Sequence, residues 1–200
     1  MIDLSPYQGL IFDMDGTLID SMPKHVEAWR QTAQKFHFSF NPQLIYQMGG
    51  MTSEEILDVI NKETQLNLDS KIIVPHKRQL FESMMDSIQS IPHTVAIIKK
   101  YHGIKKIAVG TGSPKKSALY TLNRLNLLPY IDVIVTCDDV ICHKPAPDTF
   151  LTAAKKLDLA PHDGIIFEDT PTGLKAAQAA KMDAILVTKN HLEFKPYFPK

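Results

Sequence analysis

Short apolar runs that alternate with helical spacing constrain most strongly what this chain can fold into. Five such runs span residues 9–12, 106–110, 132–136, 164–167 and 183–187. Each is bounded by turn residues, which is typical of buried parallel strands. The alternation of strands and helices predicts an α/β fold with a doubly wound, parallel, Rossmann-like sheet.

The gap between the first two runs is the second constraint. It is about ninety residues long, far beyond a normal crossover. It holds no strand-like run, and its spacing predicts helices over residues 23–37, 41–48, 52–63 and 69–87. Thr52 and Glu55 have the spacing of a capping box. We therefore expect a small all-helical cap domain, residues 21–89, inserted after the first strand of a core domain formed by residues 1–20 and 90–200.

Further local signals mark where elements begin and end. Ser113-Pro114, Pro145-Ala146-Pro147 and Thr170-Pro171 each place a capping side chain or a proline in the first turn of a predicted helix. The tail "NHLEFKPYFPK", from Asn190 on, is predicted to be an irregular surface segment.

Composition excludes several classes of function. The 22 basic and 22 acidic residues balance, which argues against nucleic-acid and anionic-membrane partners. The sequence has no apolar stretch of about 18 residues and no signal-peptide pattern. Cys137 and Cys142 indicate no disulfide framework, and "CDDVICH" fits no common zinc spacing. We expect a cytoplasmic monomer.

Polar residues of one chemical kind follow the predicted strands, at the sheet edge where open α/β folds bind ligands. These residues are Asp13, Asp15, Gly16 and Thr17 after the first strand, Thr111, Gly112 and Ser113 after the second, Lys144 in a later loop, and Glu168, Asp169 and Thr170 after the fourth. Carboxylates as close as Asp13 and Asp15 repel each other, so a cation or a phosphoryl group is expected beside them.

This set of residues suits phosphoryl transfer with magnesium. A hard divalent cation prefers oxygen ligands and keeps several waters, so two or three carboxylates suffice. Asp13 is suited to act as both ligand and nucleophile, forming an aspartyl-phosphate. Asp15 is suited to protonate the leaving oxygen and later to activate water.

The remaining strand-end residues suit phosphate binding. Thr111, the backbone N–H groups near Gly112 and Ser113, and the helix start at Ser113 can hold phosphate oxygens. Lys144 can neutralise the charge that develops on the phosphoryl group. "GTGS" is neither a dinucleotide fingerprint nor a P-loop, and "DMDGT" is not an EF-hand loop, because the required glycine or lysine positions do not match.

Taken in order, "DMDGT", "GTGS", "KPAPD" and "FEDTPTGLKAA" resemble the motif set of haloacid dehalogenase (HAD) superfamily phosphohydrolases. The resemblance spans residue 9 to about residue 188. The helical insert is similar to that of the β-phosphoglucomutase-like branch. Within that branch, "IDSMPKHVEAWR" and "CHKPAPDTF" most resemble bacterial fructose-1-phosphate phosphatases. The resemblance implies a magnesium-dependent phosphatase acting on small sugar phosphates.

The resemblance also implies roles for individual residues. It makes Asp13 the nucleophile and Asp15 the general acid/base. It assigns Mg²⁺ to Asp13, the backbone carbonyl of Asp15 and Asp169, with Glu168 as a further ligand or as an acid behind the ligands. It assigns the transferring phosphoryl group to Thr111, Gly112 and Lys144.

In the cap, His25 and Trp29 match a His-x3-Trp pattern that meets the sugar side of the site in this family. Gly50 and Thr52, in the cap loop 48–53, are expected to face the substrate as well. His25 and Trp29 are also four residues apart on one helix, so packing against neighbouring helices is an equally open interpretation.

A phosphosugar mutase on the same scaffold is the first alternative. Resembling mutases carry a lysine and an arginine in the cap loop, where this chain has Gly49 and Ser53, with the anionic Glu54 beside them. A second phosphate held there would lack a cation. Lys77 and Arg78, on the next cap helix, could partly supply one, so the alternative stays open.

Two further alternatives lie outside catalysis of this kind. Response-regulator receivers also place acids and a lysine at sheet ends, but they are shorter and put the phospho-acceptor on a later strand. A catalytically inactive binding module is disfavoured because Asp13, Asp15, Lys144 and Asp169 are all present.

Overall fold

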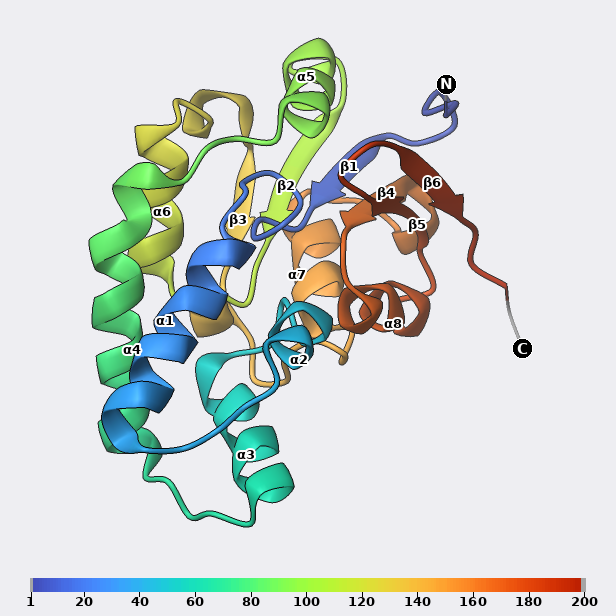
Figure 1. Ribbon diagram of the computed structural model, residues 1–200. Helices are drawn as coiled ribbons and strands as arrows, with labels where there is room; N and C mark the ends of the chain where they lie inside the picture. The colour runs from blue at the N-terminus through green and yellow to red at the C-terminus, as the bar shows by residue number, and fades with distance from the viewer. Residues whose placement is uncertain (1, 199–200) are drawn as a thin grey trace.

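The computed structural model describes residues 2–198 and places its parallel strands at the apolar runs of the sequence (Figure 1). The strands are β1 (Gly9–Phe12), β2 (Lys106–Gly110), β3 (Val133–Val135), β4 (Gly164–Glu168), β5 (Asp183–Val187) and β6 (Leu192–Lys195). They form one sheet in the order β3-β2-β1-β4-β5-β6, in which the first five run parallel. The predicted doubly wound α/β fold is confirmed.

The tail corrects one prediction. Residues 192–195 are not irregular but form β6, which pairs antiparallel with β5. Phe194 lies opposite Ile185, and the turn closes through a hydrogen bond from the Thr188 N–H to the His191 carbonyl. An edge strand that is covered on one side needs no continuous apolar run, so the sequence pattern of β6 was weak. Residues 199–200 of the predicted tail lie outside the described residues.

Helices cover both faces of the sheet. They are α5 (Pro92–Tyr101) and α6 (Lys115–Arg124) on one face, and α7 (Asp148–Lys156) and α8 (Pro171–Ala179) on the other. Alternate residues of β1 serve the two faces. Leu10 and Phe12 pack with Val95 of α5, whereas Ile11 packs with Phe150 of α7. Because both faces are buried, β1, β2 and β4 are apolar apart from Lys106 at the start of β2 and Glu168 at the end of β4.

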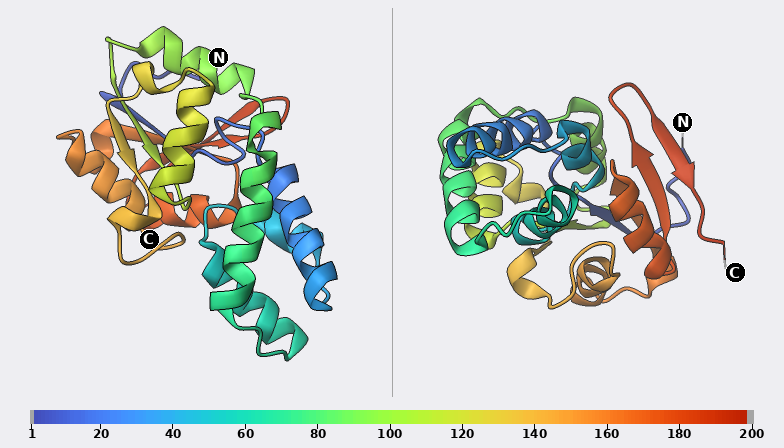
Figure 2. Two further views of the ribbon diagram at one scale, coloured as in Figure 1. Left: turned by 90° about the vertical axis from the view of Figure 1, so that its left-hand side faces the viewer. Right: turned by 60° about the horizontal axis from the view of Figure 1, so that its bottom comes forward.

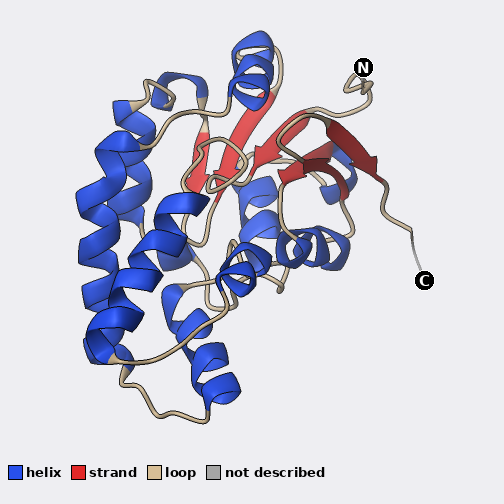
Figure 3. Cartoon of the chain, viewed as in Figure 1, coloured by secondary structure: helices blue, strands red, loops and turns tan. Residues whose placement is uncertain are grey.

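The segment between β1 and β2 is helical, as predicted (Figure 3). It contains α1 (Met22–Phe36), α2 (Pro42–Gln47), α3 (Ser53–Thr64), α4 (Ser70–Met84) and the 3₁₀ turn Met85–Ser87. These helices share a buried cluster of their own, in which Trp29 is fully covered. Figure 2 shows α1 and α4 side by side. Within residues 2–198, no helix is both long and apolar enough to cross a bilayer.

The chain passes between sheet and helices twice, and the two passages are hydrogen-bonded to each other. The Ile91 N–H donates to the Leu18 carbonyl at 2.8 Å, and the Asp20 N–H donates to the Gln89 carbonyl at 2.9 Å. The Thr94 hydroxyl also donates to the carbonyl of Thr17 at 2.6 Å. The helical segment is thus held to the sheet by one narrow, two-stranded connection, directly beyond the end of β1.

Candidate active site

Three charged side chains meet at the carboxyl ends of β1 and β4. The Nζ atom of Lys144 lies 2.6 Å from Asp13 Oδ1 and 2.8 Å from Glu168 Oε2. Asp13 is 1% exposed, and the other two are completely buried. Lys144 arrives in the loop before α7, so the parallel topology unites residues that are far apart in the sequence. A buried cation of this kind is stable only while its acidic partners remain.

The cluster carries more negative than positive charge. Burial and the charge of Glu168 raise the pKa of Asp13 to about 8. The same two causes raise the pKa of Asp169 well above its ordinary value. Burial alone would lower the pKa of Lys144, but the carboxylates of Asp13 and Glu168 outweigh it and raise that pKa. An additional cation would therefore be stabilised here.

The donor set fits Mg²⁺. Oxygen atoms of Asp13, Glu168 and Asp169 lie within 4.8 Å of one another. Among the residues that the structure describes, no hydrogen-bond partner reaches the buried Oδ2 atom of Asp13. Glu168 Oε1 already accepts the N–H groups of Asp169 and Thr170, at 3.0 Å each. Asp13 and Asp169 thus have free ligand capacity, while Glu168 holds Lys144 in place.

Gly16 explains how Asp169 approaches the first motif. Gly16 adopts φ +96°, a conformation that side-chain-bearing residues rarely adopt, and a Cβ atom there would lie 2.2 Å from Asp169 Oδ2. The neighbouring Thr17 hydroxyl donates to Asp169 Oδ1 at 3.0 Å. The glycine therefore allows both the sharp turn after Asp15 and the close approach of the second acid.

The carboxylate of Asp15 is bound by a different set of groups. Ser21 Oγ donates to Oδ1 at 2.6 Å, and Ser113 Oγ donates to Oδ2 at 2.8 Å. His25 Nε2 lies 3.3 Å from Oδ1. Burial would raise the pKa of Asp15, but the hydrogen bonds from His25, Ser21 and Ser113 outweigh it and hold the pKa well below its usual range. Asp15 is therefore ionised at neutral pH without substrate.

Thr111 and Ser113 of the "GTGS" motif also contact Asp15. The Thr111 hydroxyl lies 3.3 Å from Asp15 Oδ2 and accepts the Ser113 N–H at 3.0 Å. The expected capping role of Ser113 was wrong, because α6 begins at Lys115 with Pro114 as its N-cap and no side-chain cap. Its hydroxyl is used by Asp15 instead. Gly112 faces the helical segment, since a Cβ atom there would lie 2.3 Å from the Gly50 carbonyl oxygen.

His25 connects Asp15 to the helical segment. Its ring stacks on Phe81 with centroids 3.9 Å apart, and its Nδ1 lies 2.9 Å from Lys77 Nζ. Burial and the charge of Lys77 lower the pKa of His25, so the ring is neutral at pH 7. Since lysine can only donate, Nδ1 accepts and Nε2 carries the proton toward Asp15, a tautomer that follows from the partners.

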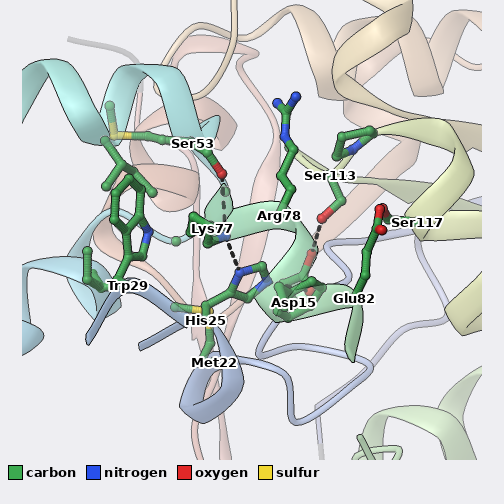
Figure 4. A pocket seen from close by; sticks show the side chains of 18 residues that line it. Asp15, Met22, His25, Trp29, Ser53, Lys77, Arg78, Glu82, Ser113 and Ser117 are labelled. Atoms are coloured by element: carbon green, nitrogen blue, oxygen red, sulfur yellow. Dashed lines mark hydrogen bonds and ion pairs between the residues drawn. The ribbon is translucent and has the colours of Figure 1, made fainter. Parts of the chain in front are cut away.

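A cavity of about 60 Å³ lies between the helical segment and the sheet (Figure 4). Of the residues proposed from the sequence, its lining includes Asp15, His25, Trp29, Gly50 and Gly112. Trp29 both packs in the helical cluster and lines this cavity, so the two interpretations of this residue coexist.

The cap loop closes one wall of the site. Gly50 (φ +86°) lies so close to Lys144 that a Cβ atom would be 2.8 Å from its Cδ. Thr170 Oγ1 lies 3.1 Å from the Gly49 carbonyl oxygen, which attaches the loop to the start of α8. Thr52 does not line the cavity, because its hydroxyl and N–H form the capping box with Glu55 at the start of α3.

The contacts of two residues of this site, Ser21 and Lys77, were not predicted from the sequence. Ser21 stands at the N-cap of α1 without capping it, and it lies four residues before His25 on the same helix. A serine at a helix start followed by histidine at that spacing was the available signal. Lys77 was considered only as a phosphate-binding cation, and nothing local reveals that it contacts His25, 52 residues away.

Comparison with known proteins agrees with this geometry. Residues 10–187 match the haloacid dehalogenase-like hydrolase family, and the chain belongs to that family. It is 39% identical to the fructose-1-phosphate phosphatase of Escherichia coli over 180 residues, which are 90% of this chain and 95% of that protein. It is 28% identical to the β-phosphoglucomutase of Bacillus subtilis, covering 89% of this chain and 82% of that protein.

Solved structures show the same fold. A β-phosphoglucomutase from Clostridium difficile superimposes with a TM-score of 0.82 at 26% identity, covering 91% of this chain and 85% of that one. A hydrolase from Pseudomonas syringae gives a TM-score of 0.83 at 26% identity, covering 92% and 86%. The chain is thus an enzyme of the HAD-like hydrolase family with a β-phosphoglucomutase-like fold.

Proposed function

We propose that this chain is a magnesium-dependent phosphatase that hydrolyses small sugar phosphates, with a ketohexose 1-phosphate such as fructose 1-phosphate as the first candidate. The observation that carries the proposal is the unpartnered Oδ2 atom of Asp13, buried beside Lys144 and Asp169. The 39% identity to a fructose-1-phosphate phosphatase supports the substrate class.

In the first chemical step, an Asp13 oxygen attacks phosphorus and the ester P–O bond breaks. When a phosphate dianion comes near, the pKa of Asp15 rises and its carboxylate takes up a proton from solvent, which it then gives to the leaving sugar oxygen. Lys144 stabilises the charge on the transferring group, while Asp13 and Asp169 would hold Mg²⁺. When bound, Mg²⁺ supplies positive charge toward the phosphate oxygens.

In the second step, water attacks phosphorus and Asp13 leaves as a carboxylate. The attacking water gives its proton to Asp15, which returns to the protonated state. His25, Ser21 and Ser113 keep the Asp15 carboxylate oriented through both steps, because each donates to it in the substrate-free site. Product phosphate and the free sugar alcohol balance the reaction.

We also propose that residues 21–89 act as a cap domain that closes over the site while the phosphoenzyme forms. The contacts from Thr170 and Thr172 to the carbonyls of Gly49 and Gln47 support a closed arrangement here. The narrow connection at residues 18–20 and 89–91 would be the pivot. Small-angle scattering should show a more compact protein with a phosphate mimic and Mg²⁺ than without; identical profiles would count against closure.

Hydrolysis is favoured over mutase activity by the state of Lys77. Its ammonium group already contacts His25 Nδ1 at 2.9 Å and Ser53 Oγ at 3.4 Å, so it is not free to hold a second phosphate. The protein incubated with β-glucose 1-phosphate and a trace of the 1,6-bisphosphate should release phosphate. Faster formation of glucose 6-phosphate than of free phosphate would make the protein a mutase.

Phosphate release from a panel of sugar monophosphates, with and without Mg²⁺, tests the proposal as a whole. Excess chelator should abolish turnover, and Mg²⁺ should restore it. Asp13→Asn should abolish turnover while the far-ultraviolet circular dichroism spectrum stays unchanged, because the nucleophilic oxygen is lost and the side-chain shape is kept. Undiminished turnover in either experiment would contradict the mechanism.

A further inference from the structure

An ion pair beside the cavity neutralises one of the charged side chains that line it. Arg78 of α4 lines the cavity, and its Nη2 atom lies 2.9 Å from each carboxylate oxygen of Glu54 on α3. The two side chains are 39% and 47% exposed, so the pair faces solvent at the rim. The guanidinium is thereby neutralised by a neighbour rather than left free for a ligand.

A second acid reinforces this effect. Glu82 follows Arg78 by one helical turn and lines the same cavity. Within residues 2–198, its carboxylate has no ion-pair partner. The cavity lining therefore includes Arg78 and Glu82, and the charge of Arg78 is balanced by Glu54, which lies outside the lining. Lys77, the neighbouring cation, is buried and turned toward His25 and Ser53.

We propose that Glu54 is a specificity-determining residue that makes this site select phosphomonoesters whose far end is uncharged and hydroxylated. The inference rests on the proposed function, in which the phosphate lies at Asp13 and the rest of the substrate extends toward the cap. A second phosphate in the cavity would meet Glu82 while Arg78 is already engaged by Glu54, and like charges repel. Hydroxyl groups can instead donate to the Glu82 carboxylate and accept from Arg78.

The test uses two substrates that differ only at the far end, fructose 1-phosphate and fructose 1,6-bisphosphate. The unaltered protein should show a higher kcat/KM for the monophosphate. Glu54→Gln removes the charge, keeps an acceptor for Arg78, and should narrow that ratio roughly three- to tenfold, mainly through the KM for the bisphosphate. Asp58→Asn removes an exposed charge from the same helix and should leave the ratio unchanged.

A binding experiment separates this inference from the proposed function. Asp13→Asn and Asp13→Asn/Glu54→Gln proteins are titrated calorimetrically with both sugars, so no turnover is needed. Glu54→Gln should tighten bisphosphate binding relative to monophosphate binding, and raising the salt concentration should shrink the difference because exposed charges are screened. A ratio that is the same with and without Glu54, or binding of neither sugar, would overturn the inference. A shifted ratio in these variants, together with no phosphate release by the protein that retains Asp13, would instead refute only the proposed function.

Discussion

The two sides of the site each bury a lysine, but they treat its charge in opposite ways. On the sheet side, Lys144 lies between Asp13 and Glu168, and these carboxylates raise its pKa although burial opposes this. On the helical side, Lys77 is 3% exposed, and burial lowers its pKa to about 8. The groups that it contacts directly are neutral: His25, Ser53 and the ring of Phe81, whose centroid is 5.2 Å away.

In the proposed mechanism, this difference separates the side that performs the chemistry from the side that positions Asp15. The carboxylates of Asp13 and Glu168 favour the charged form of Lys144, which suits its proposed role of stabilising the transferring phosphoryl group. Lys77 is close to losing its proton in mildly alkaline solution, and it acts through the neutral ring of His25 on Asp15. The sheet side concentrates charge, while the helical side orients the acid that moves protons.

The largest expected effect falls on Asp15, which receives hydrogen bonds from both sides. Asp15→Asn keeps the size of the side chain but removes proton transfer, so kcat should fall by about 10²–10⁴-fold in steady-state phosphate release. Asp20→Asn, an exposed acid nearby, is the matched control and should stay close to the unaltered rate. An Asp15→Asn protein within threefold of the unaltered enzyme would remove this residue from the mechanism.

Lys144→Met comes next and tests the sheet side directly. Losing the cation leaves Asp13 and Glu168 buried without a positive partner, and the free energy of unfolding should fall by about 3–5 kcal/mol in magnesium-free buffer. Added Mg²⁺ should stabilise the variant more than it stabilises the unaltered protein. Lys156→Met breaks only the exposed pair with Asp139 and should lose about 1 kcal/mol or less. Equal losses in the two variants would mean that burial of the cluster is unimportant.

A smaller effect is expected in the pH dependence of stability. Asp13 has a folded-state pKa of about 8 against an ordinary 3.8, because burial and Glu168 disfavour its charge. The folded protein therefore binds the extra proton between those values, and the free energy of unfolding falls as pH rises from about 4 to about 8. Asp13→Asn should lack this fall. Denaturant unfolding of both proteins without Mg²⁺ measures this effect. The free energy of unfolding of the Asp13→Asn protein minus that of the unaltered protein should increase with pH over this range. A constant difference would contradict the raised pKa of Asp13.

The smallest effect concerns Lys77 and has the opposite sign. Burial lowers its pKa from 10.5 to about 8, so the unfolded chain binds more protons between these values. The contribution of Lys77 to the free energy of unfolding therefore rises with pH from about 8 to about 10.5. Lys77→Met should lack this rise, whereas Lys71→Met, an exposed lysine of the same helix, should keep it. Chemical unfolding at pH 7.5 and pH 10 measures the difference; an unchanged slope in Lys77→Met would show that its environment does not disfavour the charge.

Much of the fold could be predicted because burial on both faces leaves a plain pattern. The runs that became β1, β2 and β4 are apolar apart from Lys106 at the start of β2 and Glu168 at the end of β4, and the strand-free gap after β1 indicated the helical insertion. The edge strand β6 was missed because it is only partly buried, with Glu193 and Phe194 both exposed, and its sequence "LEFK" mixes apolar and charged residues. Local pattern predicts an element only where its surroundings are uniform.

The residues of the candidate site also fall into two groups: those that the sequence pattern predicted and those that it did not. Asp13, Lys144 and Asp169 were proposed from the sequence because parallel strands necessarily bring their carboxyl ends to one edge. The roles of Ser21 and Lys77 could not be found in this way. A serine at a helix start usually caps the helix, and a lysine on a helix is usually exposed, so their local signals favoured other functions.

What the sequence determined by itself is therefore the chemistry of the strand ends: the acids, the lysine and the glycine turn follow from motifs whose order the α/β topology makes meaningful. Only the tertiary structure decided which side chains of the helical segment lie beside these residues and what those side chains contact. Whether Lys77 meets His25, and whether Arg78 meets Glu54, depends on how α4 packs against α1 and α3. Helix packing is set by many weak side-chain contacts at once, and no short stretch of sequence encodes it.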